Sequence, residues 1–82
     1  MPSTLSLREK AYISALIFRI RDAENPHREK EIRIFTRIVD MFLSKNRIND
    51  KQKRLLLEAL TGNAVSEMEA FDEVENALNA GK

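Results

Sequence analysis

The sequence predicts an all-α protein, a small bundle of about four helices that is expected to form dimers. Apolar residues recur at helical spacing along most of the chain, and only two glycines and two prolines interrupt it. Serine and asparagine residues also stand where helix N-caps are needed. The 82 residues form one domain, 1–82, and its ends, 1–4 and 80–82, are expected to fray.

The first two helices are defined by a capping box and a proline. The first is expected over residues 6–24 and opens with a serine that Glu9 follows three residues later, so that each side chain can bind the other's backbone N–H. Asn25 and Pro26 end this helix, because proline disfavours the helical conformation in the residue before it. Proline also suits a first helical position, so the second helix is expected over residues 26–45.

Two shorter helices complete the predicted bundle. Asn49 is expected to cap the third, over residues 50–61, which a glycine and an asparagine then close. A second capping box, Ser66 with Glu69, opens the fourth helix, which is expected to end near Asn79.

The first two helices carry more apolar surface than a single buried stripe needs. Apolar residues cover roughly 200° of the second helix, whereas a surface helix needs only about 100°. That surplus predicts that the second helix is buried on two sides. In the first helix we expect a core stripe of Tyr12, Ile13, Leu16, Ile17, Ile20 and Ala23.

A second apolar line runs along the far side of the first helix. Either the second helix is simply the central helix of the bundle, or this line and part of the second helix form an interface. Such a small chain has no cysteine for disulfides, which leaves oligomerisation as a source of further stability. The predicted partner or dimer interface consists of Leu7, Ala11, Phe18, Ile34 and Met41.

Residues that carry catalysis are sparse. The chain has no cysteine, and its single histidine, His27, is expected at the exposed start of the second helix. A nucleophile needs a neighbouring base and an orienting group, and no such set is apparent in the sequence. We therefore expect no catalytic residues, metal site, cofactor or small-molecule substrate.

Basic residues gather around the second helix and the turn after it. The net charge is +1, but residues 1–62 hold 13 Lys and Arg against 8 Asp and Glu, and residues 63–82 hold one against five. One interpretation is a phosphate-binding corner. The alternative is a set of helix-surface ion pairs, Glu29–Arg33, Arg37–Asp40 and Asp50–Arg54. The candidate phosphate contacts are Lys30, Arg33, Arg37, Lys45, Arg47, Lys51, Lys53 and Arg54.

No segment suggests a membrane or export. The longest uncharged run, residues 11–18, is too short to span a bilayer. The first residues lack a basic region followed by an apolar core, which a secretory signal would show. We expect a cytoplasmic protein.

The segment IVDMFLSKNRINDKQKRLLLEAL, residues 38–60, resembles the helix–turn–helix of the small AriR/YmgB biofilm and two-component connector proteins. The resemblance rests on Leu43-Ser44, on the four residues from Ile48, and on the leucines of the third helix. It implies a small helical dimer that regulates through protein contacts and DNA binding. The segment is less than a third of the chain, and Lys45 or Asn46 stands where the family has a glycine.

These observations favour a small, non-enzymatic regulatory or adaptor protein that works by protein–protein binding, as a homodimer. The apolar surfaces of the first two helices would form its contacts. The alternative is a nucleic-acid-binding regulator that uses the basic corner between the second and third helices.

Overall fold

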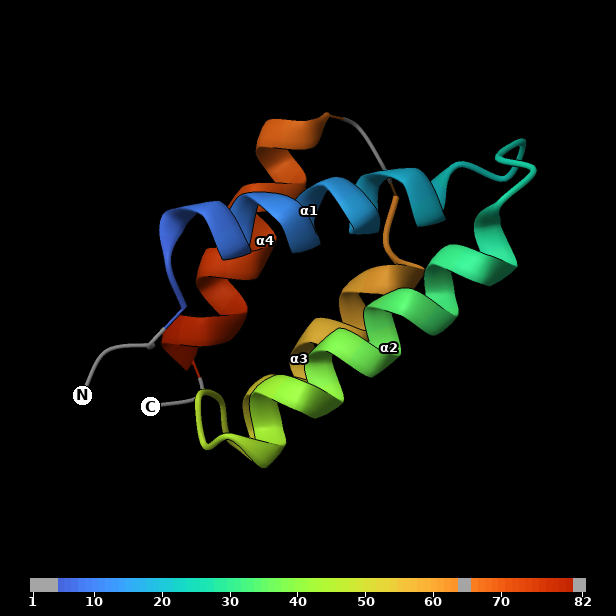
Figure 1. The fold of residues 1–82 in the computed structure, drawn as a ribbon. Coiled ribbons are helices and arrows are strands. Elements are labelled where there is room, and N and C mark those ends of the chain that lie inside the picture. The colour runs from blue at the N-terminus through green and yellow to red at the C-terminus, as the bar shows by residue number, and fades with distance from the viewer. Residues whose placement is uncertain (1–4, 64–65, 81–82) are drawn as a thin grey trace.

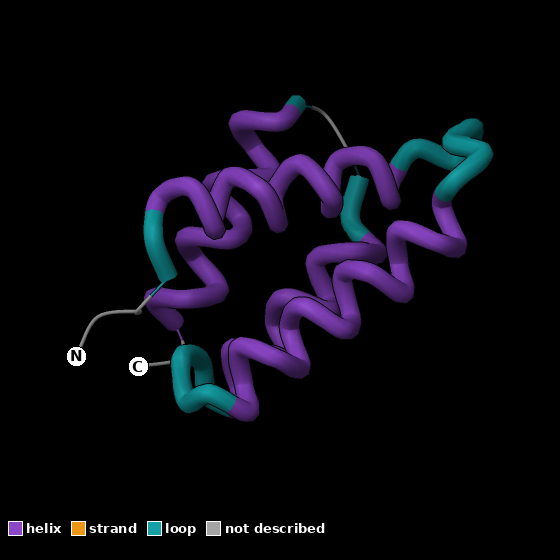
Figure 2. The backbone as a smooth tube through the Cα atoms, viewed as in Figure 1, coloured by secondary structure: helices purple, strands orange, loops and turns teal. Residues whose placement is uncertain are grey.

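Four α-helices joined by short loops make up the structure, a computed structural model that describes residues 5–63 and 66–80 (Figure 1). Within those ranges there are helices and loops but no strand, which confirms the all-α class (Figure 2). The helices are α1 (Leu7–Arg21), α2 (Arg28–Ser44), α3 (Asp50–Glu58) with the 3-10 turn η1 (Ala59–Thr61), and α4 (Glu67–Ala80).

The helices form a closed ring in which each one packs against two others. α1 contacts α2 and α4, α3 contacts the same two, and the described residues make no contact across either diagonal. η1 packs against α1, α3 and α4. In Figure 1, α2 and α3 lie side by side as a hairpin, and α1 crosses in front of α4. α4 therefore packs against both α1 and the α3 arm of the hairpin, which closes the ring.

The predicted helix starts are confirmed where capping residues define them. At the start of α1, Ser6 Oγ accepts a hydrogen bond from the Glu9 N–H at 3.1 Å, and the Glu9 carboxylate accepts one from the Ser6 N–H at 2.8 Å. Asn49 makes the same reciprocal pair with Gln52 at the start of α3. Ser66 accepts a backbone N–H in the first turn of α4.

The loop between α1 and α2 is longer than predicted. α1 ends at Arg21, three residues early, and α2 begins at Arg28, two residues late. The reason is that side chains occupy the carbonyls that another helical turn would use: Asn25 Nδ2 donates to the Arg19 carbonyl at 3.0 Å, and Arg28 Nε donates to the Ile20 carbonyl at 2.6 Å.

The other boundaries differ little from the prediction. The last turn of the third helix is the 3-10 turn η1. α4 extends to Ala80, one residue beyond the predicted end and within the range that is expected to fray. The other residues expected to fray, 1–4 and 81–82, lie outside the described part of the chain.

The turn between α2 and α3 dispenses with a glycine. The Arg47 N–H donates to the Phe42 carbonyl at 2.9 Å and the Asn46 N–H to the Leu43 carbonyl at 3.0 Å, which is the Schellman arrangement of a helix C-terminus. Asn46 occupies the left-handed position with φ of 58°. Asparagine tolerates this conformation better than most residues do, so the turn forms without a glycine.

The core is one cluster to which all four helices contribute. Two residues of the predicted α1 stripe, Tyr12 and Ala23, are exposed, because Ala23 lies in the loop and Tyr12 lies at the edge of the helix. α2 packs against both α1 and α3, as its surplus of apolar surface predicts, although only Phe35, Val39 and Phe42 are fully buried. Buried apolar side chains are those of Leu5, Ile13, Leu16, Ile17, Ile20, Phe35, Val39, Phe42, Ile48, Leu56, Ala70, Val74, Ala77 and Leu78.

A buried arginine fastens the end of α1 to the rest of the ring. The Arg21 side chain is 1% exposed, and its Nη2 lies 2.5 Å from the Glu73 carboxylate of α4. Its Nε donates to the Ala59 carbonyl at 2.8 Å and its Nη1 to the Asn63 carbonyl at 3.3 Å. A Cβ atom at Gly62 would lie 2.6 Å from Nη2, so a larger residue at this position would force the guanidinium to move away from its partners.

The first prediction concerns the substitution Gly62→Ala. We expect it to lower the free energy of unfolding by about 1–3 kcal/mol, as overpacking usually does. Backbone strain is not the reason, because φ of −76° and ψ of 177° suit alanine. Urea unfolding followed by circular dichroism measures the effect.

The matched control is the same substitution in an Arg21→Met protein. There the clash is gone, and the lower entropy of the unfolded chain should make Gly62→Ala stabilising by about 0.4–1 kcal/mol. If Gly62→Ala has the same effect in both backgrounds, Arg21 is not what requires the glycine.

Candidate interaction surfaces

Two lines of exposed side chains follow the outer edges of the α1–α2 pair. Both recur at steps of three, four or seven residues, so each line stays on one side of its helix. Tyr12 is 52% exposed and Met41 is 42% exposed, which is high for large apolar side chains. We call this surface the α1/α2 face; it consists of Arg8, Tyr12 and Arg19 of α1 and Lys30, Ile34, Arg37 and Met41 of α2.

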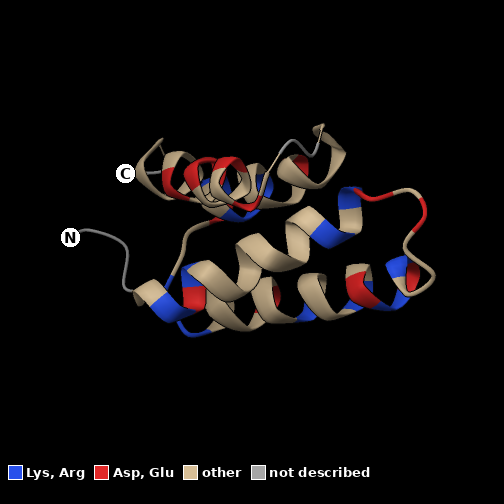
Figure 3. Ribbon diagram, turned by 90° about the horizontal axis from the view of Figure 1, so that it is seen from above, with Lys and Arg blue, Asp and Glu red and all other residues tan. Residues whose placement is uncertain are grey.

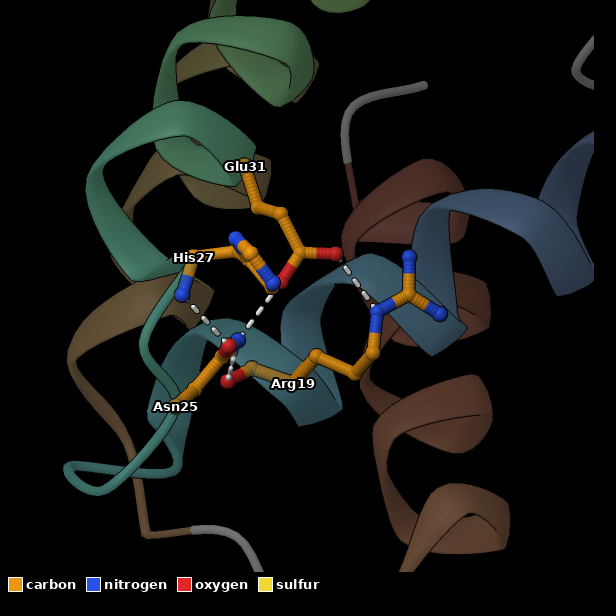
Figure 4. Close-up of polar contacts among 4 residues, drawn as sticks. All are labelled: Arg19, Asn25, His27 and Glu31. Atoms are coloured by element: carbon orange, nitrogen blue, oxygen red, sulfur yellow. Dashed lines mark hydrogen bonds and ion pairs between the residues drawn. The ribbon is translucent and has the colours of Figure 1, made fainter.

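A polar network closes the α1/α2 face at the loop end (Figure 4). Arg19 Nε donates to Glu31 Oε2 at 2.6 Å, and Asn25 Nδ2 donates to Glu31 Oε1 at 2.6 Å. The hydrogen bonds from Asn25 and Arg19 lower the pKa of the Glu31 carboxyl. The His27 backbone N–H donates to Asn25 Oδ1 at 2.9 Å, which fixes the asparagine that holds α1 to α2.

A second ion pair joins α1 to the far end of α2. The Arg47 guanidinium binds the Glu9 carboxylate through two parallel hydrogen bonds of 2.6 and 2.5 Å, and it also lies 5.3 Å from the centre of the Phe42 ring. The bonds from Arg47 and from the Ser6 backbone lower the pKa of Glu9 to about 2. The side chain that caps α1 therefore also fixes the turn after α2.

These pairs leave the α1/α2 face positively charged. Its two neighbouring carboxylates, Glu9 and Glu31, are each engaged by an arginine. Within the described residues Arg8, Lys30 and Arg37 make no ion pair, and all three are exposed. α4, by contrast, has five acidic residues and no basic one; Figure 3 shows its acidic residues near the C-terminus, on the opposite side of α1 from α2.

A second apolar surface lies where α1 crosses α4. Leu7 is 72% exposed and Met68 is 75% exposed. Between the helices runs an open groove of about 490 Å³, and Ser14, Ala15 and Glu67 contribute to its walls. We call this surface the α1/α4 face; it consists of Leu7 and Ala11 of α1 and Met68 and Phe71 of α4.

The structure divides the interface predicted from sequence. Leu7 and Ala11 lie on the α1/α4 face, whereas Phe18 is partly buried against the core and lines the hollow beside the α1–α2 loop. Ile34 and Met41 lie on the α1/α2 face, so the five residues do not form one patch.

Two exposed side chains of these faces were not predicted. Tyr12 was assigned to the core, although its place four residues after Arg8 and seven before Arg19 puts it on a line of charged residues. The exposure of Met68 could not be predicted, because the helical spacing of apolar residues in α4 does not show which helix α4 crosses.

The expected ion pairs on the helix surfaces are wrong. Asp40 pairs across the helices with Lys53 at 2.6 Å rather than with Arg37 on its own helix. In the described part of the chain, Arg33 and Arg54 also make no ion pair. Of the eight candidate phosphate contacts, Arg47 and Lys53 are engaged with carboxylates, and six are exposed: Lys30, Arg33, Arg37, Lys45, Lys51 and Arg54.

A hollow of about 680 Å³ lies beside the α1–α2 loop. Its lining combines Arg19, Arg21, Asp22 and Glu24, and His27 is not part of it. No group of three His, Cys, Asp or Glu side chains that could hold a metal ion occurs among the residues with a described position. No helix in this part of the chain is long and apolar enough to cross a membrane.

Comparisons of the chain with protein-family models, with curated proteins and with solved structures found no match.

The second prediction concerns the pH dependence of stability through Glu9. The folded protein holds the pKa of this carboxyl near 2, below its ordinary value of 4.5. Because the folded pKa is depressed, the pair contributes its full stability above pH 4.5 and loses it as the pH falls towards 2. Glu9→Gln should therefore lower the free energy of unfolding at pH 7, and the difference from wild type should shrink steadily below pH 4.5.

Urea unfolding of both proteins across this pH range provides the test. Asp40→Asn is the matched control, because Asp40 also pairs with a cation across two helices, but through a single contact with Lys53 rather than through two hydrogen bonds to an arginine. A difference between wild type and Glu9→Gln that stays constant down to pH 2 would contradict the assignment.

Proposed function

We propose that this protein is a small, cytoplasmic, non-enzymatic regulatory or adaptor protein that works by binding other proteins as a homodimer. The observation that carries the proposal is the exposure of large apolar side chains on two sides of α1. Leu7 and Met68 are 72% and 75% exposed on the α1/α4 face, and Tyr12 and Met41 are 52% and 42% exposed on the α1/α2 face. Clusters of this kind are characteristic of binding surfaces.

The α1/α4 face is the better candidate for self-association. Its groove is lined by the small side chains of Ala11, Ser14 and Ala15, which allow a second helix to approach closely. Burying an exposed leucine or methionine stabilises an assembly by about 1.5–3 kcal/mol per side chain, and a two-fold axis doubles that gain. The resemblance of residues 38–60 to a family of small dimeric regulators agrees with a dimer.

The third prediction is that the wild-type protein dimerises through this face. Sedimentation equilibrium should give a dimer at micromolar concentration, whereas Leu7→Asp and Met68→Asp should each give a folded monomer. Both residues are highly exposed, so the fold itself should change in stability by no more than about 0.5 kcal/mol. Circular dichroism checks that the helices remain.

Met41→Asp is the control for this experiment. It introduces the same charge on the α1/α2 face and should leave the dimer intact. A wild-type protein that stays monomeric at every concentration refutes the homodimer. If Met41→Asp dissociates the dimer and Leu7→Asp does not, the dimer interface lies on the α1/α2 face and this prediction is contradicted.

Nucleic-acid binding is the second candidate function, and one specific observation favours it. Six basic side chains of α2, α3 and the turn between them are exposed and make no ion pair within the described residues, although intrahelical partners were expected for several. Such side chains are free to bind phosphates.

The fourth prediction follows for this candidate. Labelled DNA or RNA should bind at low salt, and each phosphate contact should contribute a slope of about −0.9 on duplex DNA when log affinity is plotted against log salt. The double variant Arg33→Gln/Arg54→Gln should make this slope less steep by the amount expected for the loss of about two phosphate contacts. If no nucleic acid is shifted at low salt, this candidate function is excluded.

A further inference from the structure

The α1/α2 face has the chemistry of a site for a helix. Lys30, Ile34, Arg37 and Met41 alternate cation and apolar side chain along one edge of α2, at steps of four and three residues. On α1, Tyr12 stands between Arg8 and Arg19 in the same manner. A partner that covers this face must therefore offer apolar side chains and negative charge together.

The two edges belong to one surface because ion pairs join the helices at both ends. Arg19 binds Glu31 at the loop end, and Arg47 of the following turn binds Glu9 near the start of α1. Between these pairs, Ile34 and Ile38 of α2 are only partly buried against the core. The surface is thus an apolar strip along two neighbouring helices, with Arg8 and the paired Arg19 on the α1 side and Lys30 and Arg37 on the α2 side.

The charges decide what kind of partner fits. Glu9 and Glu31 are already engaged, so they add no free negative charge to the surface. Arg8 remains exposed on the α1 edge, and Lys30 and Arg37 remain exposed on the α2 edge. A ligand that lies along the strip meets positive charge on both of its flanks.

We infer that the α1/α2 face binds an amphipathic helix of another protein, one whose apolar stripe is bordered on both sides by carboxylates. An amphipathic helix in a groove between two helices is a common mode of peptide recognition. The strip favours this occupant over nucleic acid, because phosphates would leave Tyr12, Ile34 and Met41 without apolar partners. The inference rests on the proposed function, in that the protein acts by binding proteins, but it does not need the dimer.

The experiment uses two labelled synthetic peptides, each as long as α2 and each with leucines along one face of the helix. One has glutamates on both flanks of the stripe, and the other has lysines there. In fluorescence-anisotropy titrations of the full chain, the glutamate peptide should bind and the lysine peptide should bind at least about tenfold more weakly.

Variants then locate the site. Arg37→Glu should lower the affinity for the glutamate peptide about tenfold or more and raise the affinity for the lysine peptide, because it reverses the charge at one contact. Met41→Asp should weaken both peptides. Leu7→Asp, on the α1/α4 face, is the control and should bind the glutamate peptide as the wild type does.

The outcomes separate this inference from the dimer. A monomeric wild-type protein that binds the glutamate peptide refutes the homodimer and supports the helix site. A dimer that binds neither peptide, or binds both equally, overturns the helix site. The helix site is also overturned if Arg37→Glu and Met41→Asp bind the glutamate peptide as the wild type does. It is overturned as well if duplex DNA competes with the peptide and Met41→Asp does not weaken peptide binding.

Discussion

The buried guanidinium of Arg21 fixes the position of α1, and both candidate faces depend on that position. It reaches the carbonyl of Ala59, the carbonyl of Asn63 and the carboxylate of Glu73, so one side chain joins α1 to η1 and to α4. A charge buried to this extent is tolerated only when carboxylate and carbonyl groups surround it. Lys10 Nζ also pairs with Glu75 Oε2 of α4 at 3.2 Å, but this is a single contact, whereas the Arg21 guanidinium reaches three groups.

Ion pairs at the other contacts of α1 set its spacing from α2. Arg19 and Glu31 hold the helices together at the loop, and Glu9 and Arg47 hold them at the opposite end. Both pairs use up carboxylates that would otherwise neutralise the surface. The positive charge of the α1/α2 face is therefore a consequence of how the helices are joined, as well as of the residues on their edges.

Much of the fold could be predicted from local signals. The capping residues Ser6, Asn49 and Ser66 gave the starts of three helices, because these bonds form within one turn. The end of α1 could not be predicted in this way. It depends on Asn25 and Arg28 reaching back to carbonyls of the preceding helix, which spacing along the chain does not reveal.

The interaction surfaces were predicted only in part. Helical spacing identified Leu7, Met41 and other apolar residues outside the core stripes, but it could not show that α1 separates them into two faces. That separation follows from which side of α1 each neighbour occupies. The same limit explains the ion pairs: Asp40 finds Lys53 on another helix, a contact that depends on tertiary packing.

Tyr12 offers the most direct test that the two faces are independent. It is the only tyrosine of a chain without tryptophan, so its fluorescence reports on the α1/α2 face alone. Quenching by acrylamide should be equally efficient in dilute and in concentrated protein, because the proposed self-association would use the α1/α4 face. It should fall when a glutamate-flanked helix without aromatic residues is added. Protection of Tyr12 by self-association, or full quenching in the presence of the bound helix, would contradict the account.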